Sequence, residues 1–252
     1  MTDHARPLGP AFYAAPSRAT RRAWADWWVL LHPPYTLWHL SYVAIGATIA
    51  PRFDGGRLVA TLVAFLLAVG VCAHALDELH GRPLCTAIPG WLLVGAAAAS
   101  LAGAVALGIV GMERVGAGLG VFIAVGVALT VGYNLELLGG RLHNDVTFAA
   151  AWGAFPVLTA YYAQAESLHL PALAAAAAAY WLSVAQRSLS TPARTLRRRV
   201  ASVDGTVTYG DGRTAKLSIS GMLAPLETAL KATACGVVAL AVALIVYRIT
   251  DT

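Results

Sequence analysis

The chain has 252 residues, of which 58% are hydrophobic and only 12% are charged. Soluble domains carry roughly 25% charged residues, so this composition excludes an ordinary soluble domain and indicates an integral membrane protein. The formal net charge is +5. The basic residues lie mostly beside apolar segments, where they specify membrane topology, and we therefore expect no nucleic-acid partner.

Seven apolar runs predict the membrane helices, because about 20 apolar residues are needed to cross the hydrocarbon core of a bilayer. The first run is the shortest. A segment rich in Arg and Trp at 17–31 precedes it, which is typical of a helix that lies in the headgroup layer. The seven runs are 35–50, 57–79, 91–111, 116–138, 146–164, 168–184 and 225–247.

Residues 200–220 break this pattern. Val207 and Tyr209 alternate with polar residues and Asp211-Gly212 follows as a turn, so this segment predicts a small β-hairpin outside the bilayer. The expected fold is all-α: a polytopic integral membrane helical bundle with about seven transmembrane helices and a small cytoplasmic β-hairpin insertion. The expected divisions are a cytoplasmic N-terminal segment with an interfacial helix (1–34), the helical membrane core (35–187), a cytoplasmic basic loop with the hairpin (188–223) and a final transmembrane helix (224–252).

Lys and Arg concentrate in the loops on one side of these runs, the side that also holds the N-terminus. By the positive-inside rule this side faces the cytoplasm, so we expect a protein of the cell membrane with a cytoplasmic N-terminus. Arg194 and the three arginines at 197–199 are interpreted as topology determinants and contacts to anionic membrane lipids. Three polar turns then share the cytoplasmic side, and one common site is expected because ionisable groups at the ends of membrane helices are costly and often functional.

The first polar turn closes the second run. His74 lies three residues before Asp77 and four before Glu78, so on a helix the three side chains share one face. Two carboxylates suit a Mg²⁺ ion that bridges a diphosphate, whereas His39 together with His74, His80 and His143 would suit Zn²⁺ or Fe²⁺. The alternative for this turn is a helix end whose charges reach interfacial water, and for His39 it is a hydrogen bond to a neighbouring helix.

The second and third polar turns follow the fourth and sixth runs. Glu136 and Asp145 flank a Gly-Gly-Arg141 segment, and Asp145 is expected to be the N-cap of the next helix. Gln186 and Arg187 end the sixth run, where a cation also complements the helix dipole. Only tertiary folding can bring these residues to the first turn.

Three stretches resemble the UbiA-type membrane prenyltransferase superfamily. The sequence DELHGRPL at 77–84 is similar to the family's first aspartate-rich motif, HPPYTL at 32–37 to its opening segment, and WGAFP at 152–156 to its fifth helix. Residues 183–191 contain no carboxylate where the family has its second aspartate-rich motif. The resemblance covers roughly residues 27–187 and implies a diverged member.

The resemblance implies an enzyme that holds Mg²⁺ against an isoprenoid diphosphate, which ionises so that its allylic carbon alkylates an acceptor. In that reading Asp77 and Glu78, with His74, hold the metal, and Arg82 and Arg141 contact the phosphates, since guanidinium groups bind phosphate through paired hydrogen bonds. Further contacts to the substrate are expected from His74, Tyr133, Glu136, Gln186 and Arg187.

The expected function is therefore a metal-dependent transferase or cyclase that acts on an isoprenoid diphosphate at the cytoplasmic face, with a lipid acceptor and membrane lipids as partners. Two alternatives stay open at this point. One is a membrane lipid hydrolase or oxidase with a metal bound by histidines and carboxylates. The other is a non-catalytic lipid-binding protein of the same fold, because one fold hosts several functions.

Overall fold

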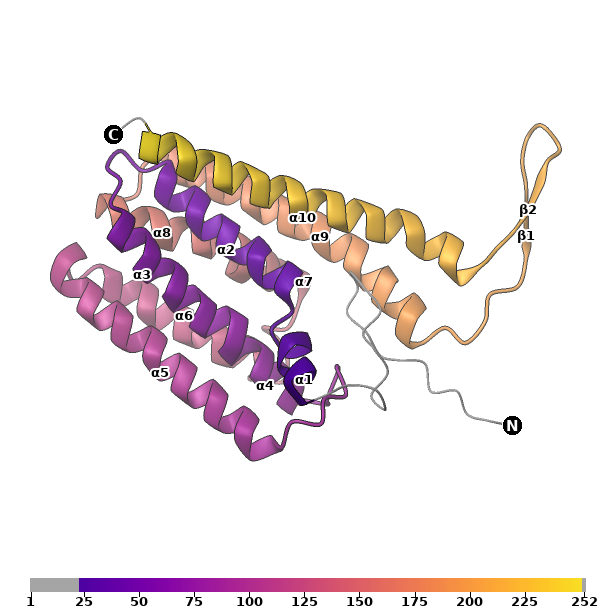
Figure 1. The fold of residues 1–252 in the computed structure, drawn as a ribbon, viewed down its shortest axis with the longest axis horizontal. Helices are drawn as coiled ribbons and strands as arrows, with labels where there is room; N and C mark the ends of the chain where they lie inside the picture. Colours follow the sequence, from indigo (N-terminus) through magenta and orange to yellow (C-terminus); the bar gives the residue numbers. More distant parts are fainter. Residues whose placement is uncertain (1–22, 251–252) are drawn as a thin grey trace.

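The computed structural model describes residues 23–250, which form a helical bundle with one small β-hairpin (Figure 1). Residues 1–22, which include the start of the predicted interfacial segment, lie outside the described part of the chain. In chain order the elements are α1 (Ala23–Leu30), α2 (Pro33–Thr48), α3 (Gly55–Phe65), η2 (Leu66–Ala73), α4 (His74–Leu79), α5 (Gly90–Val115), α6 (Leu119–Asn134), α7 (Asp145–Ala149), η3 (Ala150–Ala154), α8 (Phe155–Ala165), α9 (Leu170–Arg198), β1 (Thr206–Thr208), β2 (Thr214–Lys216) and α10 (Ile219–Thr250).

Four of the described helices are long and apolar enough to cross a membrane, which indicates a membrane protein. They are Gly55–Leu79, Gly90–Val115, Asp145–Ala165 and Ile219–Thr250. Each matches one of the predicted runs. The helices α2 and α6 have 16 residues each, fewer than the roughly 20 that span the hydrocarbon core at 1.5 Å per residue. Seven spans therefore stay a prediction.

Two of the spanning helices contain a π-helical segment. The segment η2 separates α3 from α4, and η3 separates α7 from α8. The segments pack against each other: Val69 and Ala73 of η2 form one buried cluster with Ala151 and Trp152 of η3 and with Tyr133 of α6. π-helical turns occur frequently at functional sites. The contact between η2 and η3 therefore makes the region around Tyr133 a candidate functional region.

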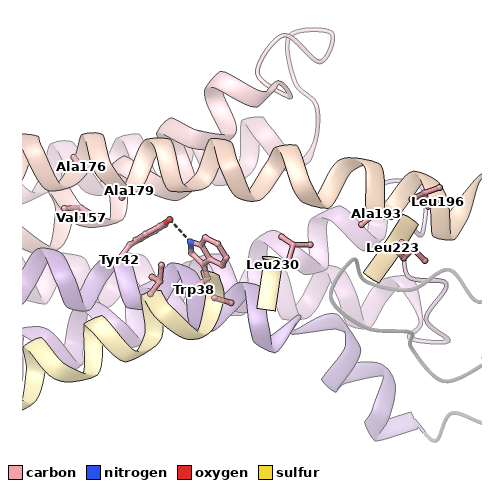
Figure 2. Packing of buried hydrophobic residues seen from close by; sticks show 11 residues of the cluster. Trp38, Tyr42, Val157, Ala176, Ala179, Ala193, Leu196, Leu223 and Leu230 are labelled. Carbon is pink, nitrogen blue, oxygen red and sulfur yellow. Dashed lines mark hydrogen bonds between the residues drawn. The ribbon is translucent and has the colours of Figure 1, made fainter. Parts of the chain in front are cut away.

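The helices α9 and α10 run side by side and extend past the other helices toward the hairpin (Figure 1). The helix α9 continues to Arg198, beyond the predicted end at 184, because Ala193 and Leu196 remain buried against Leu223 of α10 (Figure 2). The region expected to be a loop from 188 onward therefore begins as helix. The predicted hairpin is confirmed, with β1 antiparallel to β2 and Val207 opposite Ala215.

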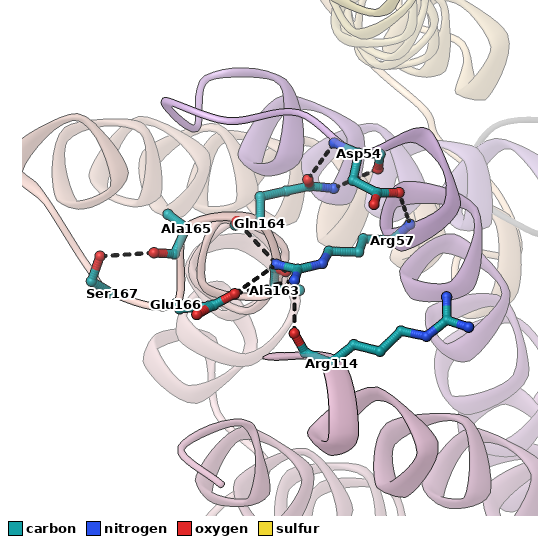
Figure 3. A network of polar contacts seen from close by, with 8 residues as sticks. All are labelled: Asp54, Arg57, Arg114, Ala163, Gln164, Ala165, Glu166 and Ser167. Atoms are coloured by element: carbon teal, nitrogen blue, oxygen red, sulfur yellow. Dashed lines mark hydrogen bonds and ion pairs between the residues drawn. The ribbon is translucent and has the colours of Figure 1, made fainter. Parts of the chain in front are cut away.

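At the end of the bundle far from α4, the side chain of Arg57 connects three helices (Figure 3). Its guanidinium donates to the backbone oxygens of Ala163 at 3.1 Å and Gln164 at 3.2 Å at the end of α8, and to the backbone oxygen of Arg114 at 2.7 Å at the end of α5. It also pairs with Glu166 at 3.1 Å. The last carbonyls of a helix have no intrahelical partner, so one side chain satisfies two helix ends at once.

Candidate anion-binding site

A group of polar side chains lies near α4, at the end of the bundle opposite Arg57. The carboxylate of Asp77 is half-buried, and no described residue donates a hydrogen bond to it. Its electrostatic neighbours are His74 of the same helix, Tyr133 of α6 and Arg198 of α9. Residues from the ends of the second and fourth predicted runs therefore converge with a part of α9 that lies beyond the predicted end of the sixth run. We call the group the polar cluster; its members are His32, Tyr35, His74, Asp77, Tyr133, Gln186, Arg194 and Arg198.

One face of α9 supplies the amide and the cations of the polar cluster. Gln186, Ser190, Arg194 and Arg198 follow one another at intervals of four, so they line the same side of the helix. Gln186 is buried beside Tyr35, but neither atom of its amide makes a hydrogen bond of normal geometry. A buried amide without partners costs about 1 to 3 kcal/mol, which is recovered when a ligand supplies them.

Sequence reasoning missed Arg194 and Arg198 as site residues and treated them as topology determinants in a loop. The interval of four from Gln186 was the signal that could have found them. This interval places the residues on one face of a helix only because α9 continues to Arg198. The electrostatic field of these two arginines reaches His32, whose ring lies just before α2.

Three histidines line or border the polar cluster. The Nδ1 of His74 hydrogen-bonds to the Gly70 carbonyl at 3.0 Å, and the Nδ1 of His39 to the Trp152 carbonyl at 2.8 Å, which confirms the predicted bond from His39 to a neighbouring helix. A carbonyl only accepts, so in both rings Nδ1 carries the proton and the neutral ring leaves Nε2 as an acceptor. The ring centroids of His32 and His74 are 5.1 Å apart, and Nδ1 of His32 has no partner among the described residues.

Burial, followed by the charges of His74, Arg198 and Arg194, lowers the pKa of His32 well below its usual value near 6.5. The folded protein therefore keeps this ring neutral at a pH where the unfolded chain binds a proton. The stability that His32 contributes is present above about pH 6.5 and is lost as the pH falls below it.

We expect the apparent melting temperature to fall between neutral pH and roughly pH 5, and to fall less in a His32→Asn variant. Thermal unfolding of the detergent-purified protein across this range measures the effect. His80→Asn, which changes a more exposed histidine, is the matched control and should keep the wild-type pH dependence. Identical pH profiles for wild type and His32→Asn would contradict the assignment.

Two residues predicted for the site instead hold the loop that follows α4. The fully buried carboxylate of Glu78 accepts hydrogen bonds from the backbone of Leu84 at 2.9 Å and of Thr86 at 2.8 Å, and from the Thr86 hydroxyl at 2.9 Å. Arg82 donates to the Ile88 carbonyl at 2.7 Å. Arg141 lies in an exposed turn. In this conformation none of the three belongs to the polar cluster.

The remaining predicted residues lie at the border of the polar cluster. Glu136 lies 3.6 Å from Nε2 of His80 and 3.8 Å from Nδ1 of His143. Arg187 forms an ion pair with Asp145 at 2.7 Å. The expected N-cap role of Asp145 is wrong: Asn144 is the N-cap of α7, because its side chain accepts a hydrogen bond from the Thr147 backbone at 2.8 Å.

Among residues 23–250, no three His, Cys, Asp or Glu side chains are grouped so that they could hold a metal ion. Mg²⁺ in phosphate-handling sites needs fewer protein ligands, because it commonly binds through one or two carboxylates, substrate phosphates and water. Asp77 fits that role, since no residue between 23 and 250 donates a hydrogen bond to its carboxylate. Glu78 does not fit it in this conformation, since both of its oxygens already accept hydrogen bonds from the loop.

An apolar cavity of about 320 Å³ lies between α3, α5, α6 and α8. It reaches from Arg57 and Arg114 at one end to Val69 and Trp152 at the other. The Trp152 ring meets the Tyr133 ring edge to face, with centroids 5.8 Å apart. The Tyr133–Trp152 pair therefore lies where the polar cluster, which contains Tyr133, borders the apolar cavity, which Trp152 lines.

Comparisons with known proteins do not add an assignment. No family model matches the chain, and no curated protein and no solved structure matches it. Membership of the UbiA-type superfamily thus stays a prediction from the sequence.

Proposed function

We propose that this protein binds an isoprenoid diphosphate, with the diphosphate in the polar cluster and the isoprenoid tail in the apolar cavity, and transfers or cyclises the isoprenoid group. The main support for the proposal is the excess of positive over negative side chains in the polar cluster. Arg194 and Arg198 outnumber the one carboxylate, Asp77. The buried Tyr133 hydroxyl has no hydrogen-bond partner among the described residues, and the Gln186 amide makes no hydrogen bond of normal geometry. An anionic head with several acceptor oxygens matches these groups.

In the proposed reaction the bond between the allylic carbon and the diphosphate oxygen breaks, and its electron pair leaves with the diphosphate. A lipid acceptor, or a double bond of the same chain, donates an electron pair to the allylic cation and then loses a proton. Arg194 and Arg198 stabilise the charge that develops on the departing oxygens. Nε2 of His74, which is left as an acceptor by the bond from Nδ1 to Gly70, is proposed to take the proton.

Asp77 is the residue proposed to hold Mg²⁺ together with the diphosphate. When bound, the ion supplies further neutralisation of the leaving group. Glu78 and Arg82 are proposed to act indirectly, by fixing the loop that closes the polar cluster beside α4. We further propose that the polar cluster faces the cytoplasm of a cell membrane, which follows from the distribution of Lys and Arg.

A second candidate function is supported by the close approach of His32 and His74, whose ring centroids are 5.1 Å apart. Imidazole is a ligand type that Zn²⁺ and Fe²⁺ prefer, as in a metal-dependent lipid hydrolase or oxidase. Metal analysis of the purified protein separates the candidates: stoichiometric Zn or Fe favours the second one, and a requirement for added Mg²⁺ favours the first.

Incubation of purified protein with Mg²⁺ and radiolabelled allylic diphosphates, followed by solvent extraction, tests the proposed function. We expect release of diphosphate and an extractable isoprenoid product. Thermal stabilisation by the diphosphates without turnover would instead identify a lipid-binding protein. Neither stabilisation nor release with any diphosphate would contradict the proposal.

A further inference from the structure

The apolar cavity has a bounded length. Its lining ends at Trp152, beside Tyr133 of the polar cluster, on one side and at Arg57, held by its hydrogen bonds to α5 and α8, on the other. From Trp152 to Ala163, both of which line the cavity, the helix advances about 16 Å at about 1.5 Å per residue. This is roughly half of the hydrocarbon core, which is about 30 Å thick.

We infer that the apolar cavity selects isoprenoid tails of farnesyl length and that Gly126 determines this selection. The inference rests on the proposed function and deepens it. An extended chain advances about 1.2 Å per backbone bond, so one isoprene unit covers about 5 Å and about three units fill the cavity. A longer polyprenyl tail meets the Arg57 side chain or has to leave between the helices.

The middle of the cavity is bordered by aromatic rings and by Gly126, which has no side chain. The ring centroid of Phe155 lies 6.2 Å from that of Phe65 and 6.2 Å from that of Phe122. Gly126 of α6 faces this group: a Cβ atom at Gly126 would lie 3.4 Å from the Phe155 ring, an ordinary contact. A larger side chain at 126 therefore enters the cavity beside Phe155 and shortens the space for the tail.

The test uses prenyl alcohols, which carry the tail without the diphosphate. We expect saturable thermal stabilisation of the purified protein in detergent, strongest for farnesol among geraniol, farnesol, geranylgeraniol and a long polyprenol. In Gly126→Leu the preference should shift to geraniol, and farnesol affinity should fall about tenfold or more, because at least one buried isoprene unit is excluded. Ala128→Leu, on the exposed side of the same helix, is the matched control and should keep the farnesol preference.

A second variant changes the cavity in the opposite direction. Phe155→Ala removes one aromatic ring and should shift the preference toward geranylgeraniol, so the inference stays testable if Gly126→Leu does not fold. The inference is overturned if wild type shows no dependence on chain length, or if Gly126→Leu and Phe155→Ala both bind like Ala128→Leu.

Inorganic pyrophosphate and farnesyl diphosphate are measured in parallel and separate this inference from the proposed function. Stabilisation by farnesol but not by pyrophosphate, with no diphosphate release, would reject the diphosphate site and retain the tail site. Stabilisation by pyrophosphate and turnover of all chain lengths at equal rates would retain the function and reject the length selection.

Discussion

Asp77→Asn and Arg198→Ala should each reduce diphosphate release by about 10² to 10³, because each removes an electrostatic partner of the leaving group. Both side chains belong to the polar cluster, and the Asp77 carboxylate is free of hydrogen bonds to described residues. Single-turnover measurements with a radiolabelled allylic diphosphate give the effect on the chemical step. Membrane insertion and yield should stay unchanged, since neither side chain lies in a hydrophobic core cluster.

Arg199→Ala is the matched control for Arg198→Ala. Arg199 is the next residue along the chain, but it is exposed and lies outside the polar cluster. We expect it to keep wild-type turnover. Equal loss in both arginine variants would mean that only the general positive charge matters, and full turnover in Asp77→Asn would remove this carboxylate from the proposed mechanism.

Arg57→Ala should lower the free energy of unfolding by about 3 kcal/mol, the largest stability effect we expect from a single polar residue. The substitution leaves the backbone oxygens of Ala163, Gln164 and Arg114 without their donor and removes the ion pair with Glu166. Hydrogen bonds from charged groups contribute roughly 1.5 to 3 kcal/mol each. Because the Arg57 side chain is 23% exposed, water replaces part of this loss.

Denaturant or thermal unfolding in detergent measures the Arg57 effect. Arg114→Ala is the matched control: Arg114 accepts through its backbone oxygen, which the substitution keeps, and its own side chain forms no hydrogen bond or ion pair with the described residues (Figure 3). If Arg57→Ala and Arg114→Ala unfold alike, the contacts of Arg57 do not stabilise the bundle as described.

Local patterns in the sequence predicted most of the secondary structure. The apolar runs at 57–79, 91–111, 146–164 and 225–247 each correspond to a helix that meets the requirements for a membrane span. The hairpin also formed where the alternating pattern and the Asp211-Gly212 turn placed it. These features depend on periodicity and turn chemistry between near neighbours, which a sequence displays directly.

The composition of the site was harder to predict from spacing. His74, Asp77 and Glu78 share the helical spacing that suggested one metal face, yet Glu78 turns to Leu84 and Thr86. Backbone donors in the loop after α4 compete for its carboxylate, and a buried carboxylate is most stable where such donors satisfy it. The spacing within one helix gives no information about donors on the following loop.

The sequence by itself determined that this chain forms apolar helices with a small hairpin and that its costly polar groups collect at helix ends. Only the tertiary structure decided that Arg194 and Arg198 join Asp77, that the polar cluster borders the apolar cavity at Tyr133 and Trp152, and that Arg57 closes the far end. The physical reason is that burial and charge pairing depend on contacts between segments distant in the chain, whereas helix and turn formation depends on neighbouring residues.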